Sequence, residues 1–360
     1  MKSFTVTTDP VYDASYPHTR LDRYFLKMIR DPRDLPFVYL TIKITLTLWP
    51  LAILMYVPGL NNGIFWAAAI GYHILNNFVF KGPFGLMLHC TSHRVFFKKE
   101  YESLNHYLPW VLSPLFGQSP GTYYTHHIGM HHPENNLEAD ESSTMEYQRD
   151  SLRSFSKYLG SFFVVGVYDL ALYLRRKQRN KLYTRLVKGE LLFIFACIGL
   201  CFVNWPATLT VFILPFLISR VVMMLGNWAQ HSFISAASPE NPYTNSITCI
   251  NTKYNHKCWN DGYHISHHIK PSMHWSEHPT YFQKTLQDYV DNEAIVFDGI
   301  HFLHVFAWLM RKRYDLLAKH FVNIGDRFAS DAEVIAFLKQ RTQRIPFASV
   351  AVPPAAPVAA

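Results

Sequence analysis

The sequence carries little charge: only 17% of its 360 residues are Asp, Glu, Lys or Arg, against about a quarter in a typical soluble domain. Apolar residues make up 49% of the chain and aromatic residues 16%. The few charges also avoid certain stretches almost completely. This distribution favours a surface that partly faces lipid over an unusually large soluble core.

The sequence also has few cysteines and no familiar redox motif. Its five cysteines form no CxxC pair, so we expect no disulfide framework and a reducing compartment. We find no GxGxxG that opens a helix, no CxxCH, no ferredoxin-type cysteine run and no HPGG haem-domain signature. No apolar core follows a basic start before Pro36, so no cleavable secretory signal is expected either.

Four nearly uncharged stretches stand out instead. Residues 35–57 contain Lys43 as their one charge and are long enough for about 35 Å of helix, which crosses a bilayer. After the turn-forming PGLNNG, residues 64–80 provide a return leg, and a second pair follows at residues 191–205 and 207–226. We predict an all-α membrane protein with four transmembrane helices as two hairpins; core helices of a large soluble protein are the alternative.

The distribution of Lys and Arg predicts the orientation. Residues 1–34 carry six of them and residues 175–188 carry seven, whereas the tight loops of both hairpins carry none. Both termini and the long middle segment should therefore be cytoplasmic, in a bacterial inner membrane or the endoplasmic reticulum. The net charge of +8 then fits a basic face beside anionic lipid, and no nucleic-acid partner is expected.

The predicted organisation has three parts. Residues 1–34 form a cytoplasmic N-terminal segment, and residues 35–345 form one membrane domain with a cytoplasmic helical cap. Residues 346–360, rich in Ala, Pro and Val, are predicted to be disordered. Within the middle segment, residues 161–174 are apolar enough to lie along the membrane interface.

Three histidine groups carry the chemistry. HCTSH contains His89 and His93, HIGMHH contains His127, His131 and His132 with His126 just before them, and HISHH contains His264, His267 and His268. Residues three or four apart share one face of a helix, so each group can aim imidazoles at one point, with His132 turned by one residue from its neighbours. Imidazoles without thiolates suit Zn, Fe, Cu or Ni, and eight clustered histidines exceed the ligands of one metal. Two metals are therefore expected.

The topology brings the three groups to one side of the membrane, because each hairpin returns the chain to its starting face. The sequence GNWAQH adds Asn227 and His231, four residues apart where the fourth span ends. Both can face the same metals. Alternatively, both are ordinary interfacial polar residues.

Several polar residues near the groups have supporting roles in this hypothesis. Asp261 lies three residues before His264 and is the expected acceptor for its second ring nitrogen. His126 competes with His127 for first place in its group. The acidic residues of the segment 134–141 are interpreted as a solvated loop, and His274 and His278 as supporting or structural residues.

These histidine boxes between two hairpins resemble the membrane-bound fatty acid desaturase and hydroxylase superfamily, over about residues 35–279. The resemblance implies a non-haem diiron centre on the cytoplasmic side. It further implies His231 as a ninth ligand, Asn227 as a ligand through water, and His127 rather than His126 as a ligand. The first box has three intervening residues and the second reads HxxxHH, spacings closer to bacterial acyl-lipid desaturases and alkane hydroxylases than to acyl-CoA desaturases.

The resemblance also implies a function: O₂-dependent desaturation of a fatty acyl chain in lipid metabolism. Such an oxidoreductase uses two Fe ions, O₂ as co-substrate, a fatty acyl substrate within membrane lipid, and a separate ferredoxin or cytochrome-type electron donor. Hydroxylation, or oxidative decarboxylation to a terminal alkene, are alternatives on the same site. A metal-binding membrane transporter and a zinc hydrolase are remote alternatives, because transporters bind near the midplane and zinc hydrolases need only three protein ligands.

Overall fold

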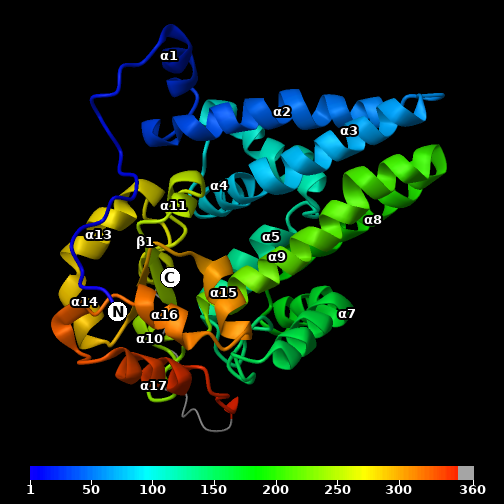
Figure 1. Cartoon of the computed structure of the whole chain (residues 1–360). Coiled ribbons are helices and arrows are strands. Elements are labelled where there is room, and N and C mark those ends of the chain that lie inside the picture. The colour runs from blue at the N-terminus through cyan, green and yellow to red at the C-terminus, as the bar shows by residue number, and fades with distance from the viewer. Residues whose placement is uncertain (348–360) are drawn as a thin grey trace.

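The computed structural model describes residues 1–347. Most of the tail predicted to be disordered, residues 348–360, lies outside the described residues. The described chain is mostly helical, with two strands of four residues each (Figure 1). The all-α prediction therefore holds apart from this small sheet.

The elements follow one another along the chain as two long helical pairs, with shorter helices between and after them. The first half contains α1 (Arg20–Leu26), α2 (Leu35–Met55), α3 (Asn62–Ile74), α4 (Lys81–His93), α5 (Thr122–His126), α6 (His132–Glu134), α7 (Leu152–Arg176) and α8 (Asn180–Thr208). The second half contains α9 (Leu214–Gln230), α10 (Pro242–Asn245), β1 (Ile247–Ile250), α11 (Lys253–Lys257), α12 (His264–Ile269), α13 (His278–Lys284), α14 (Leu286–Asp291), β2 (Ile295–Asp298), α15 (Phe302–Met310), α16 (Tyr314–His320) and α17 (Asp331–Arg341).

The first pair consists of α2 and a long helix that continues from α3 into α4. Pro36 occupies the first turn of α2, where its missing N–H costs nothing. Asn61 caps α3 by accepting the N–H of Gly63 at 2.8 Å. A π-helical segment, Leu75–Phe80, joins α3 to α4 without a break. His89 and His93 therefore lie on the same continuous helix as the second apolar stretch.

The second pair lies in one long helical stretch that bends sharply. In α8 the backbone of Asn204 is extended (φ −159°, ψ 95°), and a π-helical segment, Leu209–Ile213, leads into α9. At this bend Asn204 donates to the Met55 carbonyl at 3.2 Å, and the Thr208 hydroxyl lies 2.8 Å from the Tyr56 hydroxyl. The outer ends of the two pairs are thus fastened to each other.

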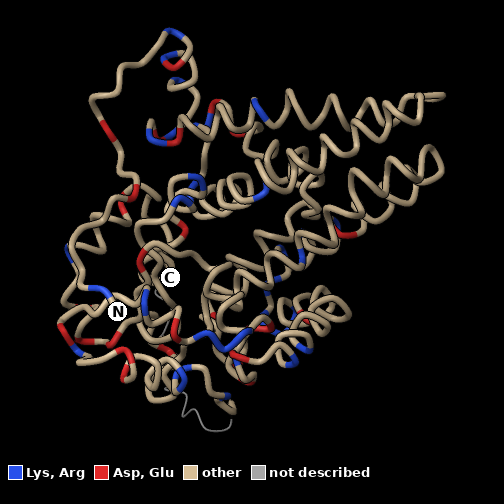
Figure 2. The backbone as a smooth tube through the Cα atoms, in the orientation of Figure 1, with Lys and Arg blue, Asp and Glu red and all other residues tan. Residues whose placement is uncertain are grey.

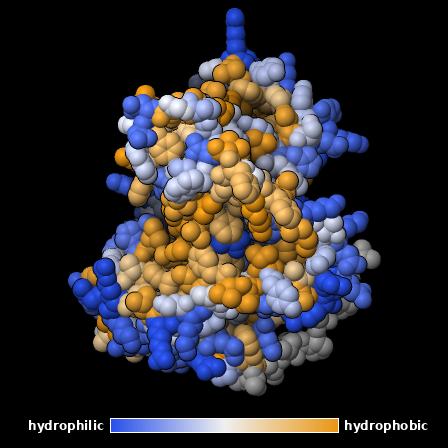
Figure 3. Space-filling model, turned by 90° about the vertical axis from the view of Figure 1, so that its right-hand side faces the viewer, coloured by the Kyte–Doolittle hydropathy of each residue, from blue (hydrophilic) through white to orange (hydrophobic). Residues whose placement is uncertain are grey.

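Four helical segments are long and apolar enough to cross a membrane, by length and composition: Pro32–Met55, Asn62–His93, Leu152–Arg176 and Asn180–Gln230. The last contains both apolar stretches 191–205 and 207–226, and the third is α7, which contains residues 161–174. Charged residues are nearly missing from the outer parts of both pairs (Figure 2), where Phe78 and Phe202 are 85% and 89% exposed. Seen end-on, this face is largely hydrophobic (Figure 3), as expected of a surface in contact with lipid.

The remaining helices form a cap at the inner ends of the pairs (Figure 1). Its core is built around the parallel pairing of β1 with β2, in which Ile247 is aligned with Ile295. The N-terminus is part of the cap, since the Lys2 N–H donates to the Phe321 carbonyl at 2.7 Å. Gly189 of α8 lets the loop before α5 approach closely, because a Cβ there would lie 1.8 Å from the Pro120 carbonyl oxygen.

Candidate metal centre

The predicted histidines come together in two groups at the inner end of the long helices. Within each group, one ring nitrogen from every histidine lies within 4.8 Å of those from the others. We call His89, His93, His127, His132 and His267 the first group, and His131, His231, His264 and His268 the second group.

The rings approach each other through their Nε2 atoms. In the first group Nε2 of His267 lies 2.9 Å from Nε2 of His89 and 2.9 Å from Nε2 of His132, and Nε2 of His127 lies 3.0 Å from Nε2 of His93. In the second group Nε2 of His264 lies 3.2 Å from that of His231 and 3.0 Å from that of His268.

A π-helical turn explains the extra residue in the second histidine box. Residues His127–His131 form this turn, in which residues five apart share a face. His127 and His132 therefore point the same way, with their Nε2 atoms 3.0 Å apart. The expectation that His127 and His131 share a face is wrong, because it assumed an α-helix: His131 belongs to the second group.

Neighbouring residues in the second and third boxes are divided between the two groups. His132 and His267 belong to the first group, whereas His131 and His268 belong to the second. The ring centroids of His132 and His268 are only 5.0 Å apart. The two groups therefore lie side by side.

Hydrogen bonds hold two of these rings in a defined orientation. Nδ1 of His131 lies 2.7 Å from a carboxylate oxygen of Asp140, and Nδ1 of His231 lies 2.9 Å from the Asn245 carbonyl. In each case Nδ1 carries the proton and donates it, so Nε2 presents a lone pair. This is the usual arrangement of a histidine that binds a metal.

The donor set fits two transition metals. The Nε2 atoms of neighbouring rings face each other at 2.9 to 3.2 Å, the spacing expected of rings that bind one cation together. Metal-to-imidazole bonds of about 2.0–2.1 Å separate neighbouring ligand nitrogens by about 3 Å. Five and four imidazoles without thiolates are within the ligand number and chemistry of iron or another borderline metal.

The protonation state of the described rings suits this role. Burial, and after it the neighbouring imidazoles, hold the pKa values of His127, His264, His267 and His268 well below the ordinary value. These rings are therefore neutral at physiological pH, with free lone pairs. Burial would raise the pKa of Asp140, but its interactions with His131, His126 and Ser142 together outweigh burial, and the pKa lies below the usual range.

Asp140 and Asp261 both differ from their expected roles. Asp140 lies in the segment interpreted as a solvated acidic loop, yet it is 2% exposed and accepts from His131. Asp261, the expected partner of His264, lies instead 3.8 Å from Nδ1 of His89, and the buried Nδ1 of His264 has no hydrogen-bond partner in the part of the chain that the structure describes. Burial raises the pKa of Asp261 to about 7.

His126 belongs to neither histidine group, and Asn227 lies beside residues of the loop after the second box. The side-chain amide of Asn227 donates to the Ser142 carbonyl at 2.9 Å and to the Tyr158 hydroxyl at 2.7 Å. The ring of His126 stacks on that of His131, with the ring centroids 6.3 Å apart and the rings nearly parallel. Of the two competing histidines, His127 is therefore the one in a group.

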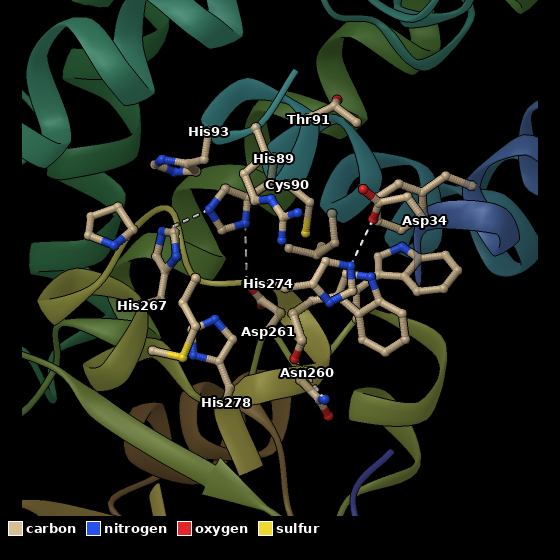
Figure 4. A pocket seen from close by; sticks show the side chains of 17 residues that line it. Asp34, His89, Cys90, Thr91, His93, Asn260, Asp261, His267, His274 and His278 are labelled. Atoms are coloured by element: carbon tan, nitrogen blue, oxygen red, sulfur yellow. Dashed lines mark hydrogen bonds and ion pairs between the residues drawn. The ribbon is translucent and has the colours of Figure 1, made fainter. Parts of the chain in front are cut away.

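A cavity borders the first group (Figure 4). His89, His267 and Asp261 line one side of it, and His274 lies on the other, with Nε2 3.0 Å from an Asp34 carboxylate oxygen. Asp31, Asp34 and His274 also lie close enough to share a cation. Arg33 and Arg94 already neutralise Asp31, and His274 hydrogen-bonds Asp34, so we interpret this cluster as a structural network.

Replacing Asp140 with asparagine should lower metal affinity by about 10- to 100-fold, because the amide accepts from His131 more weakly and leaves its ring less fixed. Titration of the metal-free protein with Fe²⁺ measures this. Glu138→Gln, an exposed change in the same loop, is the control and should leave affinity unchanged. Equal affinities for all three proteins would show that Asp140 does not support the site.

Comparison with known families gives one match. The model of a family described as fatty acid desaturase matches residues 64–299, a stretch that includes every histidine of both groups. No curated protein and no solved structure matches the chain.

Proposed function

The chain belongs to the fatty acid desaturase family, and on this premise we propose that it catalyses the O₂-dependent desaturation of a fatty acyl chain at a non-haem diiron centre. The family itself makes the protein an oxidoreductase that acts on fatty acyl chains in a membrane setting, by oxidation of the desaturation or hydroxylation type. It also implies non-haem iron. The number of irons and the particular reaction belong to the proposal.

Nine imidazoles in two adjacent groups support the proposal most strongly. We assign one iron to the first group and one to the second. When bound, two such irons supply the oxidation chemistry that removes hydrogen from an unactivated methylene, which no side-chain acid or base can do.

The surrounding residues keep this ligand set in place. Asp140 and the Asn245 carbonyl fix the rings of His131 and His231 through Nδ1, and Asp261 lies beside Nδ1 of His89. The amide nitrogen of Asn227 is held by Ser142 and Tyr158. Its side-chain oxygen is therefore the atom that we propose to contact the second group through a water molecule.

We propose that the two helical pairs cross the membrane as hairpins, with spans at about 35–57, 64–80, 191–205 and 207–226. The helix α7 then lies along the interface, because its exposed residues include both apolar Val164 and basic Lys157. The cap and both termini are cytoplasmic, since Lys and Arg gather at the inner ends of the pairs. The polar inner face is also where a separate ferredoxin or cytochrome-type donor would deliver electrons.

Product analysis tests the reaction. A host that expresses the protein and receives a defined saturated fatty acid should accumulate the corresponding monounsaturated chain, measured by gas chromatography. A hydroxy acid or a terminal alkene in place of the monounsaturated acid would contradict desaturation. It would remain consistent with oxidation of the fatty acyl chain at a diiron centre. Zinc in the purified protein, with no O₂ uptake, would instead favour a hydrolase.

A further inference from the structure

A second cavity lies between α5, α7 and α9. Its lining includes Ser119, Tyr123, His126, Phe162, Leu170 and Arg220. Two of these residues touch the metal centre: Tyr123 stacks on His127, with ring centroids 5.3 Å apart, and His126 stacks on His131 at 6.3 Å. The cavity is therefore separated from the histidine groups by a single layer of rings.

Arg220 brings an unsatisfied guanidinium to this cavity. Its side chain is only 11% exposed, and among the described residues its N–H groups make no hydrogen bond; its Nε atom is buried without a partner. The nearest carboxylate oxygen, on Glu190, is 3.6 Å away, beyond good hydrogen-bond distance. A buried Nε–H without an acceptor is uncommon, and this distant carboxylate is the one ion-pair partner of the guanidinium among the described residues.

Ser119 adds a second unsatisfied donor. It is 3% exposed, and its hydroxyl also has no hydrogen-bond partner within the described part of the chain. The rest of the lining is largely apolar, with Val167, Leu170 and Met223 among its members. Two such donors in the lining of one cavity with apolar walls suit an amphiphile with an anionic head and a hydrocarbon stem.

We propose that Arg220 and Ser119 bind the carboxylate of an unesterified fatty acid, so that the protein acts on the free acid rather than on a thioester or a glycerolipid. This inference rests on the proposed function and names its substrate class. A guanidinium matches the two oxygens of a carboxylate in a bidentate pair. An ester or thioester offers one neutral carbonyl oxygen and would add a large group at this enclosed point.

The nearby charges favour a carboxylate over a phosphate. Glu190 carries a negative charge 3.6 Å from Arg220 and itself accepts the Thr122 hydroxyl at 2.7 Å. A second singly charged group is tolerated more easily here than a doubly charged phosphate, because like charges repel strongly in a poorly solvated cavity. The guanidinium carbon of Arg220 lies 4.1 Å from the centroid of the Phe216 ring and 5.6 Å from that of Phe162. These rings pack on the faces of the guanidinium and leave its N–H edge available.

Binding experiments on the full-length, iron-loaded protein in lipid nanodiscs test this site. The probes are radiolabelled lauric acid at alkaline pH, where the acid is ionised, and methyl laurate and dodecyl phosphate of matched chain length. Arg220→Met should weaken binding of laurate by at least about tenfold, the loss of one charge-assisted pair, and leave methyl laurate nearly unchanged. Ser119→Ala should weaken laurate binding by a smaller factor.

Two further variants separate substrate binding from a structural role. Glu190→Gln should keep or tighten laurate binding, because it removes a competing negative charge. Arg327→Met is the matched control, since Arg327 also packs on two phenyl rings and its buried Nε has no partner among residues 1–347, but it lies in the cap. It should leave laurate binding unchanged.

Equal weakening of laurate and methyl laurate binding by Arg220→Met would overturn the proposal. So would a loss of laurate binding in Glu190→Gln as large as that in Arg220→Met. A larger effect of Arg220→Met on dodecyl phosphate binding than on laurate binding would also overturn it. Turnover is scored separately. If laurate binding depends on Arg220 but no unsaturated product forms, the proposed desaturation is wrong and the carboxylate site is supported. If Arg220→Met leaves turnover unchanged, the carboxylate site is wrong and the proposed desaturation is unaffected.

Discussion

Replacing His267 with alanine should abolish oxidation of the fatty acyl chain and remove at least one of the two proposed irons. His267 lies in the middle of the first group, with its Nε2 atom 2.9 Å from Nε2 of both His89 and His132. Changes to residues that merely support a metal ligand already cost about 10- to 100-fold, so loss of a ligand should exceed that range. Iron content of the purified protein and O₂ uptake with a fatty acid measure both effects.

Two other histidines make this experiment specific. His256→Ala changes an exposed histidine of the cap and should leave iron content and turnover unchanged. His126→Ala removes the histidine that precedes the second box and should keep both irons, because its ring lies outside both groups. Full turnover by His267→Ala, or loss of iron from His126→Ala, would contradict the ligand assignment.

The histidine spacings allow much of the centre to be predicted without coordinates. His89 with His93, and His264 with His268, are four residues apart, and in the structure each pair belongs to one group. Helical geometry alone gives this result. The same geometry cannot predict that His131 and His132 belong to different groups. That assignment depends on a π-helical turn, and a π turn has no sequence signature as clear as the periodicity of an α-helix.

The two carboxylates were misjudged for reasons of tertiary structure. Asp140 is surrounded by polar and charged neighbours in the sequence, and its burial depends on contacts such as that of Asn136 with Asn245 far along the chain. Asp261 precedes α12 by three residues, but it lies in a turn after Trp259 and Asn260, whose φ values are 54° and 56°, and the helix begins only at His264. The helical spacing rule therefore does not apply to Asp261 and His264.

The strands of the cap were missed for a similar reason. All four residues of β1 are buried, so the stretch shows none of the alternation that reveals a half-buried strand. Its partner β2 lies 45 residues further along, from Ile250 to Ile295. Such a short parallel pair is formed by packing in the cap core rather than by a local preference.

Replacing Arg149 with methionine should cause the largest loss of stability of any single change in the cap. Arg149 is fully buried, and its guanidinium donates to the carbonyls of Thr144, Met145, Tyr147, Ser232, Arg341 and Gln343. Burial lowers its pKa to about 9, so it keeps its charge at neutral pH. It joins three distant segments: the loop after the second histidine box, the chain just after His231, and the end of α17.

Methionine fills a similar volume but donates no hydrogen bond, so several buried carbonyls lose their partner. We expect a loss of about 3–5 kcal/mol in the free energy of unfolding, seen as a lower melting temperature and a shorter half-life in detergent. The stability of Arg149→Lys should fall between that of the unchanged protein and that of Arg149→Met, because an ammonium group has three donors and lacks the planar fork of guanidinium. Arg344→Met is the control: this exposed arginine lies 3.8 Å from Glu146, and its loss should change stability by less than about 0.5 kcal/mol. Equal melting temperatures for Arg149→Met and Arg344→Met would show that the cap does not depend on Arg149, and that Ser232 is held beside His231 by other contacts.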